Sequence, residues 1–388
     1  MRDGTASDAS AHEGGPWPED GRHRWVADPR KSAPGLDALL VWASGEGASR
    51  VAFQPGHPVW VSVHGRNRRA TAGALDEAEF SAVVNHLYGA DGMARLQGGN
   101  DFDTAYSINL DRSRRLRYRL NATPTRRARR DGGNVVLRPM RDLPPTLAEQ
   151  RVEPGIVEGY RPREGLVVVS GATGSGKSTL LAGIMVARLT DPESHANIVE
   201  AAAPVEFLLE GVGGPTSTMN QSEIPRDMPS FAAFVRGCMR REPTDIGVGE
   251  CRDGETMGAT VHASISGHKV WTTTHAGDTP STVQRIASLC PEAERANLLV
   301  SLAQSLRLVV NQRLVPSTDG RRIALREFLP FDAGLRRSLL RAAADEWPEI
   351  VRRVLPERGQ TYERAIANAL QAGLITEETA RRERAEVA

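Results

Sequence analysis

The segment that most constrains the fold of this chain is LVVVSGATGSGKSTLLAGIMVARL, residues 166–189. It holds a complete G-x-x-x-x-G-K-[ST] pattern between a β-branched strand and an amphipathic helix, the context in which this pattern forms a phosphate-binding loop. Its glycines let backbone N–H groups turn inward, and the helix N-terminus adds partial positive charge. A chance glycine-rich turn would not need both flanking elements. The segment therefore predicts polyphosphate binding by Gly171, Ala172, Thr173, Gly174, Ser175, Gly176, Lys177, Ser178 and Thr179.

Two side chains of this loop have the chemistry to hold a nucleotide with its metal. Lys177 offers a compact cation to the β- and γ-phosphates, and the Ser178 hydroxyl is suited to bind Mg²⁺. Lysine otherwise occurs only at Lys31 and Lys269, since the chain uses arginine almost everywhere. A lysine at the motif position is therefore not a product of composition, and we expect ATP and Mg²⁺ as the cofactors.

Sequence periodicity on both sides of this loop indicates an α/β protein with two folded domains. At 388 residues, the chain is long enough to bury two cores. A small domain of short strands and helices precedes a segment rich in proline and charge, and alternating apolar strands and helices follow it. The predicted parts are a disordered lead (1–33), an α+β domain (34–141), a linker (142–160), a P-loop α/β domain (161–355) and a helical tail (356–388).

Two local signals make sharper structural predictions. Gly132 and Gly133 lie between strand-like runs and predict a hairpin turn. Ser230 precedes an apolar stripe that includes Phe234 and Cys238, and it predicts a helix capped by the serine hydroxyl.

Composition excludes several classes of protein. The formal net charge of +1 gives no general attraction to nucleic acid or anionic membranes. The three cysteines lack C-x-x-C spacing, so neither a disulfide framework nor a zinc site is indicated. No apolar run approaches the ~20 residues of a transmembrane helix, and the first residues lack the apolar core of a secretory signal. We expect a cytoplasmic protein without a transmembrane segment.

Two further polar residues are predicted to lie near the phosphate loop. Glu250 follows the apolar strand 246–248, and His275 follows the strand VWTTT. The carboxyl ends of strands in an open α/β sheet meet at the ligand-binding edge, so both side chains are expected there. Glu250 is suited to hold the water shell of magnesium, and a neutral imidazole at His275 to sense the γ-phosphate. The alternatives are a solvated glutamate and a structural histidine.

Four motifs in this order carry a family resemblance: GATGSGKST, MNQSEIPRDMPSFAAFVRGCMRREP, VGECRD and SGHKVWTTTHA. Together they resemble the secretion ATPase superfamily of hexameric motors, which power type IV pili and type II and type IV secretion. The second motif is similar to the DotB/TraJ branch of type IVB secretion and conjugation, rather than to the pilus-retraction branch typified by PilT. The resemblance covers roughly residues 34–335.

The resemblance implies an architecture and a set of roles. It implies a PAS-like N-terminal domain, a RecA-like C-terminal domain, and a homo-hexamer that works with secretion-system components at the inner membrane. In this family pattern, residues 171–179 form the Walker A loop. Glu250 is the Walker B acid, which binds the metal together with Ser178. His275 belongs to the His box, together with Gly267 and His268. Arginines of the N-terminal domain that match the γ-phosphate clamp are Arg117, Arg119 and Arg138.

One stretch departs from the family pattern. Residues 199–207 read VEAAAPVEF, where the family carries a glutamate that orients or deprotonates the attacking water, followed by an aspartate. These acids fall on Ala202 and Ala203, while Glu206 remains as a second acid. Glu200 is the nearest substitute, but two residues displace it by about 6.6 Å along a strand, so a slip of the strand would be needed. Because a general base is worth about 10²–10⁴ in rate, we expect a slow ATPase.

Three alternatives to a secretion motor remain at this point. The first is a nucleotide-gated assembly scaffold that hydrolyses ATP weakly or not at all. The second is a type IV pilus retraction motor. A nucleic-acid translocase is the third, but the near-neutral charge and the absence of aromatic-basic platforms argue against it. We therefore expect no specific nucleic-acid binding.

Overall fold

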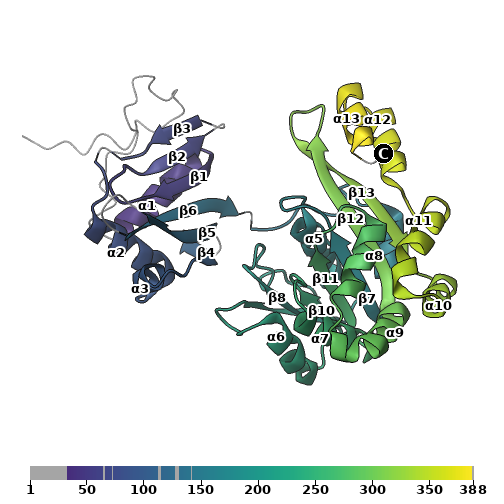
Figure 1. Ribbon diagram of the computed structural model, residues 1–388. Coiled ribbons are helices and arrows are strands. Elements are labelled where there is room, and N and C mark those ends of the chain that lie inside the picture. Colours follow the sequence, from purple (N-terminus) through teal and green to yellow (C-terminus); the bar gives the residue numbers. More distant parts are fainter. Residues whose placement is uncertain are drawn as a thin grey trace, which may run out of the picture. The chain divides into compact units, whose positions relative to one another are not determined.

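The computed structural model describes residues 33–63, 66–71, 73–111, 115–126, 131–140 and 142–386. The chain divides into two compact units, Met1–Asp142 and Leu143–Ala388, each with its own sheet (Figure 1). The predicted disordered lead, residues 1–33, lies almost entirely outside the described residues.

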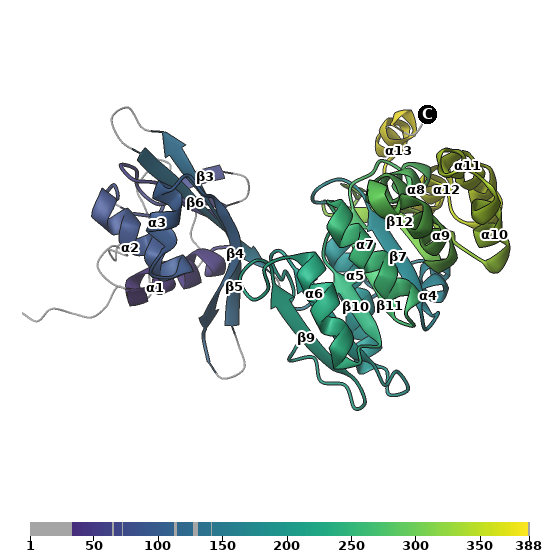
Figure 2. The same ribbon diagram turned by 60° about the horizontal axis from the view of Figure 1, so that its bottom comes forward.

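The first unit is an antiparallel sheet with helices on one face. The sheet has the strand order β3-β2-β1-β6-β5-β4. Its helices pack on the sheet through one shared apolar core, and Figure 2 shows them together beside it. The elements are α1 (Ala33–Gly45), β1 (Ala48–Phe53), β2 (Trp60–Val63), β3 (Arg66–Arg69), α2 (Glu77–Tyr88), α3 (Gly92–Gln97), β4 (Phe102–Asn109), β5 (Arg115–Arg126) and β6 (Asp131–Met140).

The predicted turn at Gly132 and Gly133 is wrong. Both glycines lie within β6, where they pair with Thr125 and Pro124 of β5. Their small size has a packing reason, because a β carbon on Gly133 would lie only 2.9 Å from ring atoms of Phe80. The glycine thus lets α2 approach the sheet.

The second unit is built on a mostly parallel sheet of order β13-β12-β7-β11-β10-β8-β9. Neighbouring strands are parallel except β12 and β13, which form an antiparallel hairpin at one edge. The long apolar runs fit this arrangement, because parallel strands are covered on both faces. The strands are β7 (Gly165–Ser170), β8 (Asn197–Ala202), β9 (Thr218–Glu223), β10 (Asp245–Val248), β11 (Lys269–Thr274), β12 (Leu306–Pro316) and β13 (Arg322–Pro330).

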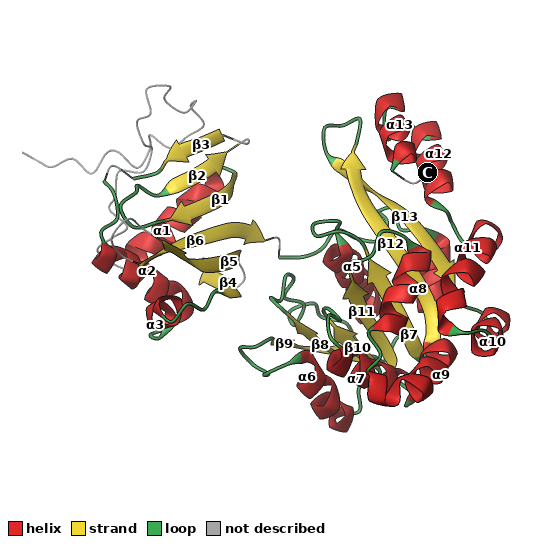
Figure 3. Ribbon diagram, in the orientation of Figure 1, coloured by secondary structure: helices red, strands yellow, loops and turns green. Residues whose placement is uncertain are grey.

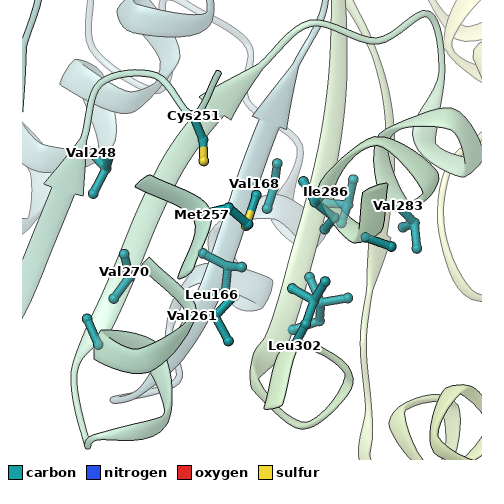
Figure 4. Packing of buried hydrophobic residues seen from close by; sticks show 14 of the residues in the cluster. Leu166, Val168, Val248, Cys251, Met257, Val261, Val270, Val283, Ile286 and Leu302 are labelled. Atoms are coloured by element: carbon teal, nitrogen blue, oxygen red, sulfur yellow. The ribbon is translucent and has the colours of Figure 1, made fainter. Parts of the chain in front are cut away.

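Helices cover both faces of this sheet (Figure 3). Alternation along β7 divides the core: Leu166 and Val168 pack with one set of helices, and Val167 and Val169 with the other. Figure 4 shows the first cluster, in which Met257 and Ile286 close over the strands. That side carries α6 (Phe231–Cys238), α7 (Gly254–Ile265), α8 (Thr279–Ser288), α9 (Arg295–Ser305), α10 (Ala333–Arg341) and α11 (Trp347–Arg358), and the other carries α4 (Pro154–Tyr160) and α5 (Lys177–Thr190).

Of the linker predicted at 142–160, all residues from Leu143 onward group with the second unit. Helix α4 lies in this stretch, and its Ile156 and Tyr160 are buried in the core shared with α5. The chain therefore enters the second unit at Leu143, and α4 is anchored in the core of that unit.

The C-terminal tail packs on the β12–β13 hairpin. Its helices are α12 (Tyr362–Gln371) and α13 (Glu377–Ala385), with a break at Gly373, whose φ of 66° favours glycine. Tyr362 is buried and donates to Asn311 Oδ1 of β12. The helical tail expected at 356–388 thus contains two helices that are separated at Gly373. Among the described residues, no helix is both long and apolar enough to cross a bilayer.

Candidate nucleotide-binding site

The phosphate loop follows β7 and adopts a backbone that only glycine accommodates well. Gly171, Gly174 and Gly176 have φ angles of 141°, 78° and 85°. A β carbon on Gly171 would clash with the carbonyl oxygen of Gln312, and one on Gly176 would lie 2.8 Å from Gln312 Nε2. The glycines therefore serve both the turn and the close approach of β12 beneath it.

Lys177 lies at the first position of α5 and reaches back over the loop. Its Nζ donates to the carbonyl oxygens of Gly171 and Ala172, at 2.8 Å and 3.0 Å. Burial lowers the pKa of Lys177, against the carboxylates of Glu250 and Glu206, which act to raise it. Phosphate oxygens are stronger acceptors than carbonyls, so we expect them to replace both carbonyls.

Glu250 and His275 meet beside this loop, at the ends of β10 and β11. His275 Nε2 lies 3.0 Å from Glu250 Oε1, and His275 Nδ1 lies 3.2 Å from the carbonyl oxygen of Gly171. Burial raises the pKa of Glu250, but the bonded Arg252 guanidinium, His275 and Lys177 outweigh it and hold this pKa below its usual value. The structure thus places a carboxylate, an imidazole and an ammonium group together.

The donor atoms near this carboxylate fit magnesium. Ser178 is exposed in the first turn of α5, and hydroxyl and carboxylate oxygens are the hard ligands that Mg²⁺ prefers. Within the described ranges, no cluster of three or more His, Cys, Asp or Glu residues is arranged to hold a metal. A magnesium ion here would take its other ligands from phosphates and water, as is usual for this ion.

Strand β8 shows where the missing acid would stand. It pairs with β10 in continuous register, Ala201 opposite Val248 and Glu200 opposite Gly247. Ala202 ends the strand, and a β carbon on Gly249 would lie 3.4 Å from the Ala202 Cβ. The slip that would move Glu200 into this place is not present in the pairing.

Glu200 is instead held in a polar pocket of its own. Gln221 Nε2 donates to Glu200 Oε2 at 2.6 Å and to the Phe207 carbonyl oxygen at 2.9 Å. Burial raises the pKa of Glu200 to about 7, against the bond from Gln221, and the charge of Glu206 adds to the rise. The charge of Glu206 therefore influences the pKa values of both Lys177 and Glu200.

The three arginines singled out in the first unit share one face of its sheet. Arg119 lies opposite Arg138 in the register of β5 and β6, and Arg117 lies two residues before Arg119, on the same face. Tyr118 points to the opposite face, where it packs into the core with the helices. Arg119 makes a two-point ion pair with Asp103 of β4, at 2.6 Å and 3.1 Å.

A cavity of about 440 Å³ opens beside the phosphate loop, within the second unit. Gly176 and Thr179 of the loop line it, together with Gln312, Leu314 of β12 and Ala369 of α12. Its volume lies in the range of small-molecule sites, about 300–1,000 Å³. The tail thus forms part of the wall of the candidate site, which the sequence did not indicate.

The structure places His268 away from the position that the sequence predicted, and it adds residues to the site that the sequence did not indicate. His268 lies at the amino end of β11, where Nδ1 contacts the Pro243 carbonyl oxygen at 2.7 Å, so it is at the opposite edge from His275. Gln221 and Gln312 were missed, because each contacts the site from a distant part of the chain. Arg252 was present in the motif VGECRD, and its charge beside Glu250 was the available signal.

Comparison with protein families gives a match over most of this architecture. The model described as "Type II/IV secretion system protein" matches residues 103–360. The "Type IV pilus retractation ATPase PilT" of Pseudomonas aeruginosa is 28% identical over 351 residues, covering 89% of this chain and 97% of the relative.

Solved structures of the same kind superpose on the chain. The Legionella pneumophila ATPase DotB has a TM-score of 0.87 at 34% identity, covering 93% of this chain and 99% of that one. The pilus retraction motor PilT with bound ADP has a TM-score of 0.74 at 24% identity, covering 88% and 94%, and this likeness shows the fold alone.

Proposed function

The chain belongs to the type II/IV secretion system protein family, and from this premise we propose that it is an ATPase that powers a type IVB secretion or conjugative transfer apparatus. The likeness to DotB, at 34% identity and a TM-score of 0.87, supports this branch over pilus retraction. The observation that carries the proposal is the convergence of Lys177, Glu250 and His275 on one loop.

The site supports a division of labour among these side chains. Lys177 and the N–H groups of residues 171–179 bind the phosphates, and Ser178 with Glu250 is suited to hold Mg²⁺. When bound, magnesium supplies positive charge to the β- and γ-phosphates. Glu250 stays ionised because Arg252, His275 and Lys177 lower its pKa. His275 bridges the loop carbonyl of Gly171 and Glu250, so it is placed to respond to a change at either.

The cavity beside Thr179 is proposed as the pocket of the nucleoside. It adjoins the loop that would hold the phosphates, and Leu314 and Ala369 give it the apolar walls that a base prefers. In the full proposal, a PAS-like first unit and a RecA-like second unit form a homo-hexamer, in which Arg117, Arg119 and Arg138 neutralise charge on the γ-phosphate. The ring is proposed to act in the cytoplasm against inner-membrane secretion components.

Steady-state phosphate release tests this proposal, together with ATP binding and the oligomeric state of the purified chain. We expect magnesium-dependent turnover that is slow for a motor, and a six-subunit particle in light scattering. A second function, a nucleotide-gated assembly scaffold, is favoured by Ala202, because the expected acid is replaced. Tight ATP binding and hexamers without turnover would identify the scaffold, while a monomer that binds no ATP would refute both.

Glu200 is proposed as the base that supports residual turnover from its own position, two residues before Ala202 on the same face of β8, since the observed register leaves it outside the place of the missing acid. A base works best when its pKa lies near the operating pH, and burial raises the pKa of Glu200 to about 7. Because only the deprotonated form accepts a proton, we expect the turnover rate to rise between about pH 6 and pH 8 and then level off. Glu200→Gln is expected to abolish this rise with pH and to lower the turnover rate at least tenfold, while the affinity for ATP stays nearly unchanged. A rate unaffected by the substitution would exclude the base role.

A further inference from the structure

Two buried polar side chains, Gln312 and Arg326, connect the phosphate loop to the segment Leu143–Glu153. They are opposite one another on β12 and β13, and are 2% and 1% exposed. Gln312 Nε2 donates to the Ser175 carbonyl oxygen at 2.6 Å, and Arg326 Nε donates to Gln312 Oε1 at 2.7 Å. A buried polar path therefore begins at the loop itself.

The chemistry of this path requires a side chain that both accepts and donates hydrogen bonds. A guanidinium only donates and a carbonyl oxygen only accepts, so the group between Arg326 and Ser175 must accept on one side and donate on the other. The carboxamide of Gln312 does this in one orientation only, with Oε1 toward Arg326. Arg326 therefore fixes the direction in which Gln312 acts on the loop.

The contact with Ser175 sets a peptide plane that faces the candidate phosphate site. The Ser175 carbonyl and the Gly176 N–H belong to one trans peptide and point in opposite directions. By holding the carbonyl, Gln312 turns the Gly176 N–H away from β12. A shift of this peptide toward a bound phosphate must move Gln312, and Arg326 must follow it.

The far end of the path holds the segment that joins the two units. Arg326 Nη1 donates to Glu153 Oε2 at 3.1 Å and to the Arg151 carbonyl oxygen at 3.2 Å, and Nη2 donates to the Gln150 carbonyl oxygen at 3.1 Å. Arg151 has a φ of 50°, which lies in the left-handed region that residues other than glycine rarely adopt. Gln150 Nε2 also donates to the Thr179 carbonyl oxygen in the first turn of α5, at 3.1 Å. The segment is thus held by hydrogen bonds from Arg326 of β13 and to the first turn of α5, and one of its residues, Arg151, has a strained backbone.

We propose that Gln312 and Arg326 are positioning residues that couple nucleotide binding at the phosphate loop to the conformation of the segment Leu143–Glu153. The coupling rests on the proposed function, since it needs a phosphate at the loop. This segment begins at Leu143, where the chain enters the second unit from the first. The strained Arg151 is the point at which a small shift of Arg326 changes the backbone.

Hydrogen–deuterium exchange of the full-length protein, with and without saturating ATP and Mg²⁺, tests the coupling. The reporters are the amides of Gln150, Arg151 and Val152, which donate to carbonyls within the same segment. We expect ATP to slow their exchange in the wild type. Gln312→Glu keeps the shape and the partner Arg326, but it sets an acceptor against the Ser175 carbonyl. It should weaken ATP binding about tenfold and remove the slowing even when ATP is saturating.

Gln304→Glu is the matched control, because it makes the same chemical change at an exposed position just before β12. It should bind ATP and slow exchange like the wild type. Glu153→Gln, which leaves the Gln312–Ser175 contact in place, is a second test, and it too should lose the ATP-dependent slowing. If thermal unfolding shows that Gln312→Glu does not fold, Glu153→Gln alone tests the coupling.

The outcomes separate the coupling from the function on which it rests. A wild type that binds no ATP would refute the proposed function and the coupling together. A wild type that binds ATP without slowing, or variants that retain the slowing at saturating ATP, would overturn the coupling alone.

Discussion

Lys177→Ala is expected to reduce phosphate release to the level of buffer and to weaken ATP binding. The ammonium group lies over the loop, where it contacts the carbonyl oxygens of Gly171 and Ala172 and is influenced by Glu250 and Glu206. Loss of one donor to a charge-developing transition state costs about 10²–10³ in rate, and Lys177 also carries a full charge. The substitution removes the ammonium group from the loop while Glu250 and Glu206 remain, so binding of the negatively charged phosphates should fall as well.

Arg161→Ala is a suitable control for this experiment. It also removes one cation from the second unit, but Arg161 is exposed at the end of α4. We expect it to behave like the wild type in phosphate release, in binding of a fluorescent ATP analogue and in thermal unfolding. An undiminished rate in Lys177→Ala would show that the observed hydrolysis does not occur at this loop.

The parts of the fold that the sequence predicted are those governed by local patterns. The apolar strands of the second unit appear where the runs of β-branched residues lie, and the helix after Ser230 is capped by that side chain as predicted. The order of the strands in a parallel sheet then brings the residues that follow them to one edge. This general rule placed Glu250 and His275 beside Gly171 without any knowledge of their contacts.

The residues that the sequence did not indicate act over long separations in the chain. Gln312 bonds to Ser175 across 137 positions, and Gln221 holds Glu200 across 21. A single glutamine in a strand has no periodicity or spacing that reveals such a partner. The error at Gly133 has the same origin, because the space it leaves is used by Phe80 from another element. Local signals predicted turns and caps, while close packing was decided by the tertiary structure.

Ala202→Glu is expected to raise ATP turnover by about 10²–10⁴, because it restores a carboxylate at the carboxyl end of β8. Ala202 is only partly buried, and it lies on the same strand face as Glu200. Ile198, two residues before Glu200 on that face, packs with α5, so the new side chain would point to the phosphate-loop side of the sheet. A side chain at Gly249 would lie against Ala202, so the glycine keeps that side of position 202 unobstructed.

Two comparisons decide what a gain in turnover means. Ala202→Gln has the same length without a basic oxygen, so it should show no gain over the wild type. The double variant Ala202→Glu with Lys177→Ala should be as inactive as Lys177→Ala alone, because a base without bound phosphates has no substrate. If Ala202→Glu binds ATP and folds normally but turns over no faster, then the rate is not limited by the missing acid. In that case the alanines would be neutral for hydrolysis, and the scaffold function would lose the observation that favours it.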